Sequence, residues 1–261
     1  MAPSPHDPDA NPEEELRRQY NELAELAGSL AHEIKNPLSV IHMNVDLISE
    51  ELAESEWSGK RRVQAKVDMI RQQCSRMDSL LHDFLRFARL RDLDMTPGSL
   101  NDQVETVLRL YQAQADRDGI EILRYLDPDL PSILLHSDSI QAALINLVKN
   151  AMEAMPDGGQ LVVRTHAVPR GIALDLIDTG CGMDDNTAMH MFEPFYSTKS
   201  GGSGLGLPTA RKIIEAHGGR IAVQSAVGRG TKFILEFPTP ARLAPSPSSS
   251  TSSTTHPSSN P

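Results

Sequence analysis

The chain has 261 residues, which is enough for one large domain or two modest ones. Its formal net charge of -10 argues against nucleic acid as the main partner, because a phosphate backbone is neutralised by clustered Lys and Arg. The two cysteines, Cys74 and Cys181, have no metal-ligand neighbours, so neither a disulfide framework nor a zinc site is indicated and we expect both thiols to be buried. The sequence contains no apolar run long enough for a membrane span and no signal peptide, which predicts a cytoplasmic protein.

The two ends of the chain differ from its middle in composition. Residues 1–13 are rich in Pro and Asp, and residues 239–261 are almost entirely Ser, Thr, Pro and Ala. Such segments cannot bury enough apolar surface to offset the entropy that ordering costs. We expect both to be disordered tails.

Residues 14–95 carry two long apolar repeats that are typical of paired helices. The first covers residues 23–52 in steps of three, four or seven, and the second covers residues 63–88 as a heptad seam. The polar segment 54–60 between them predicts a turn, with Trp57 as a packing residue. A two-helix hairpin cannot enclose so long an apolar stripe, so we expect two copies to form an antiparallel four-helix bundle. Packing of the hairpin on its own chain is the alternative.

The first helix contains the string Ser-Leu-Ala-His-Glu-Ile-Lys-Asn-Pro-Leu at residues 29–38. His32 lies roughly 160° around the helix from the neighbouring apolar positions, so its imidazole is expected to face water. A neutral imidazole is a competent nucleophile near pH 7, and the adjacent carboxylate of Glu33 can orient it or take its proton. Asn36 lies one turn further on the same face, where its amide can position a water. Pro37 removes the hydrogen bond to the Glu33 carbonyl and predicts a bend.

Residues 96–238 mix helical and strand patterns after a short linker at residues 96–98. The economical architecture for such a mixture is an α/β sandwich with helices on one face of a largely antiparallel sheet. We expect helices near 99–118, 138–155 and 208–217, and strands near 120–126, 133–135, 160–168, 172–177, 220–225 and 231–237.

Two motifs of this second half favour a nucleotide. Asn146 and Asn150 lie four residues apart on one predicted helix, and an amide oxygen together with nucleotide phosphates would satisfy Mg²⁺. Asp178 ends an apolar strand and precedes Gly180 and Gly182, so its carboxylate can accept a hydrogen bond from an exocyclic amine such as adenine N6. The alternatives are that the two amides have only a structural role in the helix, and that residues 178–183 form a simple turn.

A third motif is the glycine-rich loop at residues 201–207, which opens onto a helix near Pro208. Consecutive glycine N–H groups and the positive end of a helix favour phosphate. The loop is not a P-loop, because the Gly-Lys-Ser/Thr ending is absent, and the surrounding order is not the βαβ unit of a dinucleotide site. Lys199 can neutralise a terminal phosphate, and the glycine content predicts a lid that closes over nucleotide.

In this order, the stretches resemble the core of sensor histidine kinases. Residues 29–38 resemble the H-box of that family, and the later motifs resemble the N, G1, F and G2 boxes of its Bergerat-fold (GHKL) ATP-binding domain. The short lid with Thr198 and Lys199 resembles the nitrogen-regulation type in particular. Thr179 and Glu153 depart from the residues that many relatives carry.

The resemblance implies a role for each matched residue. In the hairpin, His32 would be the phosphoacceptor, Glu33 its acid/base partner and Asn36 an amide that assists removal of phosphate from a response regulator. In the second half, Asn150 would bind Mg²⁺ and Asp178 would read adenine. The other nucleotide contacts would come from Asn146, Gly180, Gly182, Lys199, Gly202, Gly204, Leu205, Gly206, Leu207 and Thr231.

We therefore predict an α+β protein with a dimerising helical hairpin, residues 14–95, followed by an α/β-sandwich ATP-binding domain, residues 96–238. The predicted activity is autophosphorylation of His32 with Mg·ATP and transfer of the phosphoryl group to an aspartate of a response regulator, with phosphatase action as an additional activity. The implied partners are that receiver domain, a second copy of the chain, and a separate sensor protein or other upstream input. A conformational ATPase and a non-catalytic scaffold that binds a regulator are the alternatives.

Overall fold

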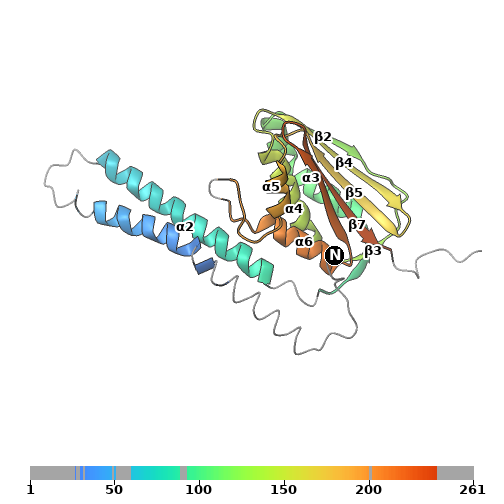
Figure 1. Cartoon of the computed structure of the whole chain (residues 1–261), viewed down its shortest axis with the longest axis horizontal. Coiled ribbons are helices and arrows are strands. Elements are labelled where there is room, and N and C mark those ends of the chain that lie inside the picture. Colours follow the sequence, from blue (N-terminus) through green and yellow to red (C-terminus); the bar gives the residue numbers. More distant parts are fainter. Residues whose placement is uncertain are drawn as a thin grey trace, which may run out of the picture.

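A computed structural model describes residues 27, 30–31, 33–48, 50, 60–88, 93–199 and 202–239. A helical hairpin is followed along the chain by a layered α/β part (Figure 1), which confirms the α+β architecture expected from the sequence. The tails predicted at residues 1–13 and beyond Thr239 lie outside the described residues. Among the helices that are described, none is long and apolar enough to cross a membrane.

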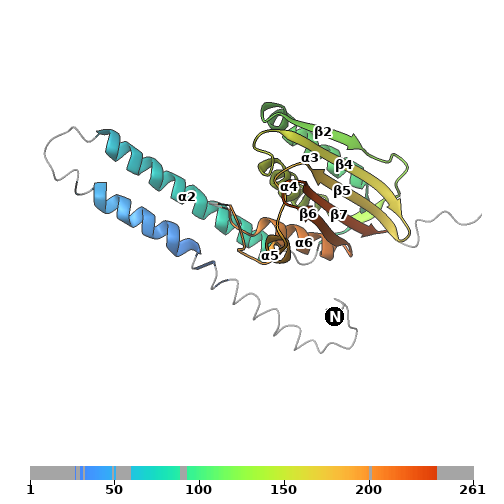
Figure 2. The ribbon, with the colours of Figure 1, turned by 45° about the horizontal axis from the view of Figure 1, so that its top comes forward.

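The hairpin pairs a helix through residues 33–48 with α2, Lys60–Ala88, and the two lie side by side in Figures 1 and 2. Among the described residues of the hairpin, Leu30 and Leu80 are buried, at 8% and 1% exposure. Asn44 is also buried, and its amide donates to the Val40 carbonyl at 2.8 Å, so this polar residue is satisfied within its own helix. The predicted turn with Trp57 lies outside the described residues.

Several large apolar side chains of the hairpin are exposed in the single chain. This is the surface that a second copy would cover, and the four-helix bundle stays a prediction. The exposed residues are Leu38, Met43, Val45, Leu47, Met69, Leu81 and Leu85.

Both cysteines are exposed, so the prediction that they are buried is wrong. Cys74 lies on the apolar seam of α2, which one hairpin leaves partly open. Cys181 lies in a loop that is held by its backbone: its N–H donates to the Ala154 carbonyl at 3.0 Å, and its carbonyl accepts from the Gly228 N–H at 2.7 Å. Packing of the backbone there leaves the thiol at the surface.

The α/β part contains a five-stranded sheet with the strand order β2-β4-β5-β7-β6. β2 runs parallel to β4, and the other neighbours are antiparallel. Residues 96–98, expected as a linker, instead form β1, Thr96–Gly98, which pairs with β3, Ile133–Leu135. The strands of the large sheet are β2, Ile120–Tyr125; β4, Gly159–Val168; β5, Gly171–Asp178; β6, Arg220–Ala226; and β7, Gly230–Pro238.

Three helices, α3, α4 and α6, form the layer on one face of this sheet (Figures 1 and 2). The Ser99 hydroxyl caps α3 by accepting from the Asp102 N–H at 3.2 Å, and Gly119 follows its end with a φ of 68°. A short helix, α5, occupies part of the stretch expected to be irregular, and its first turn is capped by Asp184. The bounds are α3, Leu100–Arg117; α4, Ser137–Glu153; α5, Asp185–His190; and α6, Gly206–Ala216.

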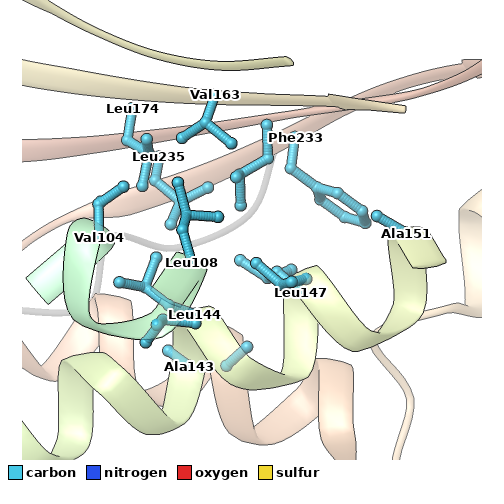
Figure 3. Close-up of a cluster of buried hydrophobic side chains, with 14 of the residues drawn as sticks. Val104, Leu108, Ala143, Leu144, Leu147, Ala151, Val163, Leu174, Phe233 and Leu235 are labelled. Atoms are coloured by element: carbon cyan, nitrogen blue, oxygen red, sulfur yellow. The ribbon is translucent and has the colours of Figure 1, made fainter. Parts of the chain in front are cut away.

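The core lies between the helical layer and the sheet. Figure 3 shows Leu108 of α3 and Leu147 of α4 among side chains of β4, β5 and β7, such as Val163 and Leu235. These residues are at most 2% exposed, and burying each contributes about 1.5–3 kcal/mol. Because α4 is packed along its whole length, the polar residues at its C-terminal end have fixed positions.

Asp175, in the middle of β5, is a buried acid that serves the fold. It is 1% exposed, and its carboxylate pairs with Arg164 at 2.9 Å and with Lys232 at 3.1 Å on the two neighbouring strands. Both partners come from the sheet itself, so this acid ties three strands together and is separate from the nucleotide motifs.

His217 joins the end of α6 to the start of α4. Its Nδ1 lies 2.7 Å from the Ile213 carbonyl, and its Nε2 accepts the His136 backbone N–H at 3.0 Å. These contacts require a neutral ring that is protonated on Nδ1. Burial lowers the pKa of His217, and nearby His136 lowers it further, against the effect of the Ile213 carbonyl.

Acidification should therefore destabilise the domain through His217. Its contribution is fully present above the unfolded-state pKa of about 6.5 and is lost as the pH falls towards the lower folded-state pKa. We expect the free energy of unfolding in urea to fall between pH 7.5 and pH 5, and to fall less in His217→Gln than in wild type. His42→Gln, a change at an exposed position of the hairpin, is the control and should keep the wild-type dependence. Equal pH dependence in His217→Gln and wild type would contradict the assignment.

Candidate functional site

The predicted acceptor string lies on the first helix of the hairpin. His32 lies outside the described residues, so its water-facing orientation stays a prediction. Glu33 is half-buried, Asn36 is exposed, and the helix continues through Pro37, which is buried. The ion pair of Glu33 stays within the hairpin, with Arg76 of α2. The structure therefore does not bring Glu33 to the predicted nucleotide residues.

Asp178 ends the central strand β5 and is 4% exposed. One oxygen, Oδ1, accepts two backbone N–H groups, from Gly180 at 2.9 Å and from Thr231 at 3.1 Å. Burial raises the pKa of Asp178, while these two hydrogen bonds act in the opposite direction. Among the described residues no donor binds Oδ2. The carboxylate is thus held in place by one oxygen and can accept a hydrogen bond with the other.

The loop after β5 is packed so closely that its glycines cannot carry side chains. A Cβ on Gly180 would lie 2.6 Å from the Ala154 carbonyl oxygen at the end of α4. A Cβ on Gly182, which has a φ of 66°, would lie 2.0 Å from the Ala226 carbonyl oxygen. The loop therefore runs between the end of α4 and the β6–β7 hairpin, as the predicted close backbone approach requires.

A pair of hydroxyls lies beside this loop. Thr231 Oγ1 and Ser225 Oγ are 3.0 Å apart, and Ser225 Oγ also accepts the Met183 N–H at 2.9 Å. Thr231 is buried, as expected for the floor of a site. Ser225 is not predicted by any local motif of the sequence, because only the register of β6 on β7, which pairs Ser225 with Thr231, identifies it as the neighbour.

At the other end of the site, α4 contacts the lid through Lys199. The Lys199 ammonium donates to Asn150 Oδ1 at 3.1 Å and also to the carboxylate of Glu153. The Glu153 carboxylate is in addition 3.8 Å from Lys149. The structure thus brings together Lys199 and Asn150, two of the predicted site residues, and it adds Glu153, which the sequence indicated only as a departure from the family pattern.

The lid is described from Gly202 onwards, and Gly201 lies outside the described residues. Gly204 has a φ of 65°, and its carbonyl accepts the Phe195 N–H at 3.1 Å, so the loop folds back on the preceding segment. Leu205 is fully buried and anchors the loop, and α6 begins at the next residue. A Cβ on Gly206 would lie 3.4 Å from Asn146 Oδ1, which places Asn146 beside the start of α6. Gly202 and Leu207 are both half-buried.

The lid also contacts the hairpin. The Ser203 hydroxyl donates to Asp83 Oδ2 of α2 at 2.7 Å and accepts the Leu205 N–H at 3.3 Å. Residues of α2 and α6 are in contact as well. The two halves of the protein therefore meet at the glycine-rich loop.

These groups suit a nucleotide with a divalent cation. Asp178 offers an acceptor for an amine, the lid and the start of α6 offer N–H donors, and Asn150 presents its amide oxygen to a cation, which is the Lys199 ammonium here. No group of three or more His, Cys, Asp or Glu within the described ranges could hold a metal. A magnesium ion at Asn150 would therefore need phosphate and water as its remaining ligands, which is the coordination that it favours.

Two family models match the chain. Residues 22–93 match the His Kinase A (phospho-acceptor) domain, and residues 136–241 match the histidine kinase-, DNA gyrase B- and HSP90-like ATPase. Sporulation kinase E of Bacillus subtilis is 31% identical over 229 residues, which are 87% of this chain and 30% of that protein. The histidine-protein kinase AtoS of Escherichia coli is 30% identical over 83% of this chain and 35% of its own length. The chain thus spans about a third of these relatives.

Solved structures of histidine kinases are also similar to this chain. The catalytic domain of histidine kinase ThkA is 30% identical and superimposes with a TM-score of 0.52 over 56% of this chain and 97% of that one. ThkA in complex with the response regulator protein TrrA is 25% identical, with a TM-score of 0.69 over 89% of this chain and 68% of that one. Full-length ShkA in complex with AMPPNP is 27% identical, with a TM-score of 0.60 over 84% of this chain and 46% of that one.

The geometry of Asp178 predicts different effects for its alanine and asparagine variants. Asp178→Ala leaves the Gly180 and Thr231 N–H groups buried without an acceptor, which should lower the free energy of unfolding by roughly 2–4 kcal/mol. Asp178→Asn keeps an acceptor oxygen and should remain within about 1 kcal/mol of wild type. Urea denaturation measures both, with the exposed Asp157→Ala as control. Equal destabilisation in the alanine and asparagine variants would contradict a structural role for Oδ1.

Proposed function

The chain belongs to the histidine kinase family, and from this membership we propose that it is an ATP-dependent protein-histidine kinase that phosphorylates its own His32 and passes the phosphoryl group to an aspartate of a response regulator. The proposal rests above all on the Asp178 carboxylate, which is buried, anchored through one oxygen and able to accept an amine with the other. The same chain also carries a glycine-rich lid and the intact acceptor string.

In the proposed site, each end of the nucleotide has its own set of residues. Asp178 binds the exocyclic amine of adenine, with Gly180, Gly182 and Thr231 around the base. Lys199 and the N–H groups of the lid bind the phosphates. The residues assigned to the lid and its surroundings are Asn146, Gly202, Gly204, Leu205, Gly206 and Leu207.

Asn150 is the proposed ligand for Mg²⁺, which would stabilise the negative charge of the phosphates when bound. Its oxygen already accepts a hydrogen bond from a cation, so the atom is available to a positive ligand. Lys199 then leaves Asn150 and Glu153 and becomes a point charge for the terminal phosphate.

In the proposed reaction, an imidazole nitrogen of His32 forms a bond to the terminal phosphorus of ATP, and the bond to ADP breaks. Glu33 takes the proton that the ring gives up. In the second step, the phosphoryl group moves from His32 to an aspartate oxygen of the regulator. Asn36 is exposed on the acceptor helix, where its amide can orient a water molecule that removes the phosphoryl group from that regulator.

The proposed partners follow from the hairpin. A second copy of the chain would cover the exposed apolar side chains at positions 38–47 and on α2, giving the four-helix bundle. The similarity to a kinase solved with its response regulator supports a receiver domain as the substrate. We place the hairpin at residues 14–95 and the ATP-binding domain at 96–238. A separate sensor input and a cytoplasmic location stay predictions.

Labelling with γ-³²P-ATP and Mg²⁺ tests the proposal directly. We expect an acid-labile, alkali-stable label on the protein, and we expect His32→Gln to abolish it because the acceptor nitrogen is gone. His42→Gln, ten residues further along the same helix, is the matched control and should keep the label. A label that persists in His32→Gln, or that is acid-stable, would remove the kinase assignment. ATP hydrolysis without any label would favour a conformational ATPase, and neither hydrolysis nor label would favour a scaffold.

Asn150→Ala should weaken Mg·ATP binding by about tenfold or more, because one of the few metal ligands is lost. The loss should shrink when binding is measured without Mg²⁺, since the amide then has no metal to hold. Calorimetric titration with and without Mg²⁺ measures this, and Asn186→Ala on the exposed side of α5 is the control. Sizing chromatography should show a dimer for both variants. Equal losses with and without Mg²⁺ would contradict the metal role of Asn150.

A further inference from the structure

An ion pair crosses the hairpin next to the proposed acceptor. The Arg76 Nη2 of α2 lies 3.9 Å from Oε2 of Glu33, the residue that follows His32. The two side chains are 36% and 31% exposed, so the pair is partly shielded from water. Among the described residues this is the one ion pair of Glu33. The ion-pair partner of the carboxylate proposed as the acid/base group therefore comes from the opposite helix.

The guanidinium of Arg76 also has an unused donor. Its Nε is buried and has no hydrogen-bond partner among the described residues. A buried N–H of a charged group without an acceptor is unfavourable, so an anion that reached it would be stabilised. A guanidinium presents its donors in a planar fork that suits carboxylate and phosphate oxygens.

Phosphorylation of His32 would add such an anion to the residue that precedes Glu33 in the sequence. A phosphoryl group on a side chain carries close to two negative charges at neutral pH, and here it would be formed one residue from the Glu33 carboxylate. Like charges on adjacent residues repel each other, and a cation paired with one of them reduces the repulsion.

We propose that Arg76 is the positioning residue of the acceptor site: from α2 it holds the carboxylate of Glu33, which follows His32 in the sequence, and it balances the charge that a phosphoryl group on that histidine would add. The proposal rests on the proposed function. The two roles can be separated, because positioning needs the planar fork of an arginine whereas charge balance needs only a positive charge.

Three variants separate these roles. Arg76→Lys keeps the charge and loses the fork, Arg76→Gln loses both, and Arg71→Gln is the matched control on the same helix. Arg71 is 75% exposed and pairs at 3.8 Å with Asp68 of its own helix, so it has no link to Glu33. Sizing chromatography and circular dichroism check that each variant is a folded dimer, like wild type.

The first measurement is labelling by γ-³²P-ATP. We expect the initial rate at saturating Mg·ATP to fall about 10- to 100-fold in Arg76→Lys and Arg76→Gln, with the KM for ATP unchanged, because the nucleotide residues belong to the other domain. The level of label at equilibrium with added ADP should stay near wild type in Arg76→Lys and fall about tenfold in Arg76→Gln. Arg71→Gln should match wild type in both.

A double-mutant cycle with Glu33→Gln tests whether Arg76 acts through Glu33. If it does, adding Arg76→Gln to Glu33→Gln lowers the initial rate by less than about threefold. A full multiplicative loss in the double variant would overturn the positioning role, since a merely structural arginine would act in either background. An equilibrium level that falls equally in the lysine and glutamine variants would overturn the charge role.

Phosphoramidate provides a test that does not depend on the nucleotide site. The N–P bond of phosphoramidate breaks and releases ammonia, while an N–P bond forms to the imidazole of His32 and the ring proton leaves. Phosphoramidate should label His32 more slowly in Arg76→Gln than in wild type or Arg71→Gln, and equal rates would overturn the proposal for Arg76. If ATP fails to label the wild type, the proposed kinase function fails, and the phosphoramidate rates still decide the role of Arg76.

Discussion

The nucleotide site depends on the two backbone N–H groups that donate to one oxygen of Asp178. One donor comes from the loop after β5, and the other comes from Thr231 at the start of β7, so a single carboxylate fixes the end of the central strand, the glycine loop and the last hairpin relative to each other. Because the carboxylate is 4% exposed, losing a donor would leave a buried charge poorly solvated. The end of the site proposed to bind adenine is therefore held by the sheet that carries it.

The phosphate end of the site is held by a different kind of contact. Lys199 reaches Asn150 and Glu153, and Ser203 reaches Asp83, through side chains that are exposed or partly buried. Exposed ion pairs contribute only about 0–1 kcal/mol each, so an incoming phosphate and its metal can replace them at small cost. In this structure the protein's own charges lie where those ligands are expected, a cation at the Asn150 oxygen and a carboxylate at the lid serine. The proposed site thus combines a fixed end at Asp178, assigned to the base, with an exchangeable end at Lys199 and the lid, assigned to the phosphates.

The sequence predicted the residues with intrinsic chemistry better than it predicted their partners. Asp178, Asn150 and Lys199 were identified from local motifs, because a carboxylate before glycines or an amide pair on a helix is visible within a few residues. Glu153 and Ser225 were missed as partners, because their contacts depend on how distant segments pack. The exposed thiols, β1 and α5 were missed for a related reason: short elements and surface loops leave weak periodicity. The orientation of His32 stays a prediction, since that residue lies outside the part of the chain that the structure describes.

The residues of the acceptor helix and those of the proposed nucleotide site belong to two separate contact networks. Glu33 is tied to Arg76 within the hairpin, while Asp178 and Lys199 are tied to elements of the α/β part. The link described between the halves at the lid is a serine–carboxylate hydrogen bond with the adjoining contact of α2 and α6. Small polar interfaces between domains permit relative motion, whereas a large apolar interface would prevent it. The Ser203 hydroxyl, which belongs to the lid, therefore helps to join the two halves, together with the contact of α2 and α6.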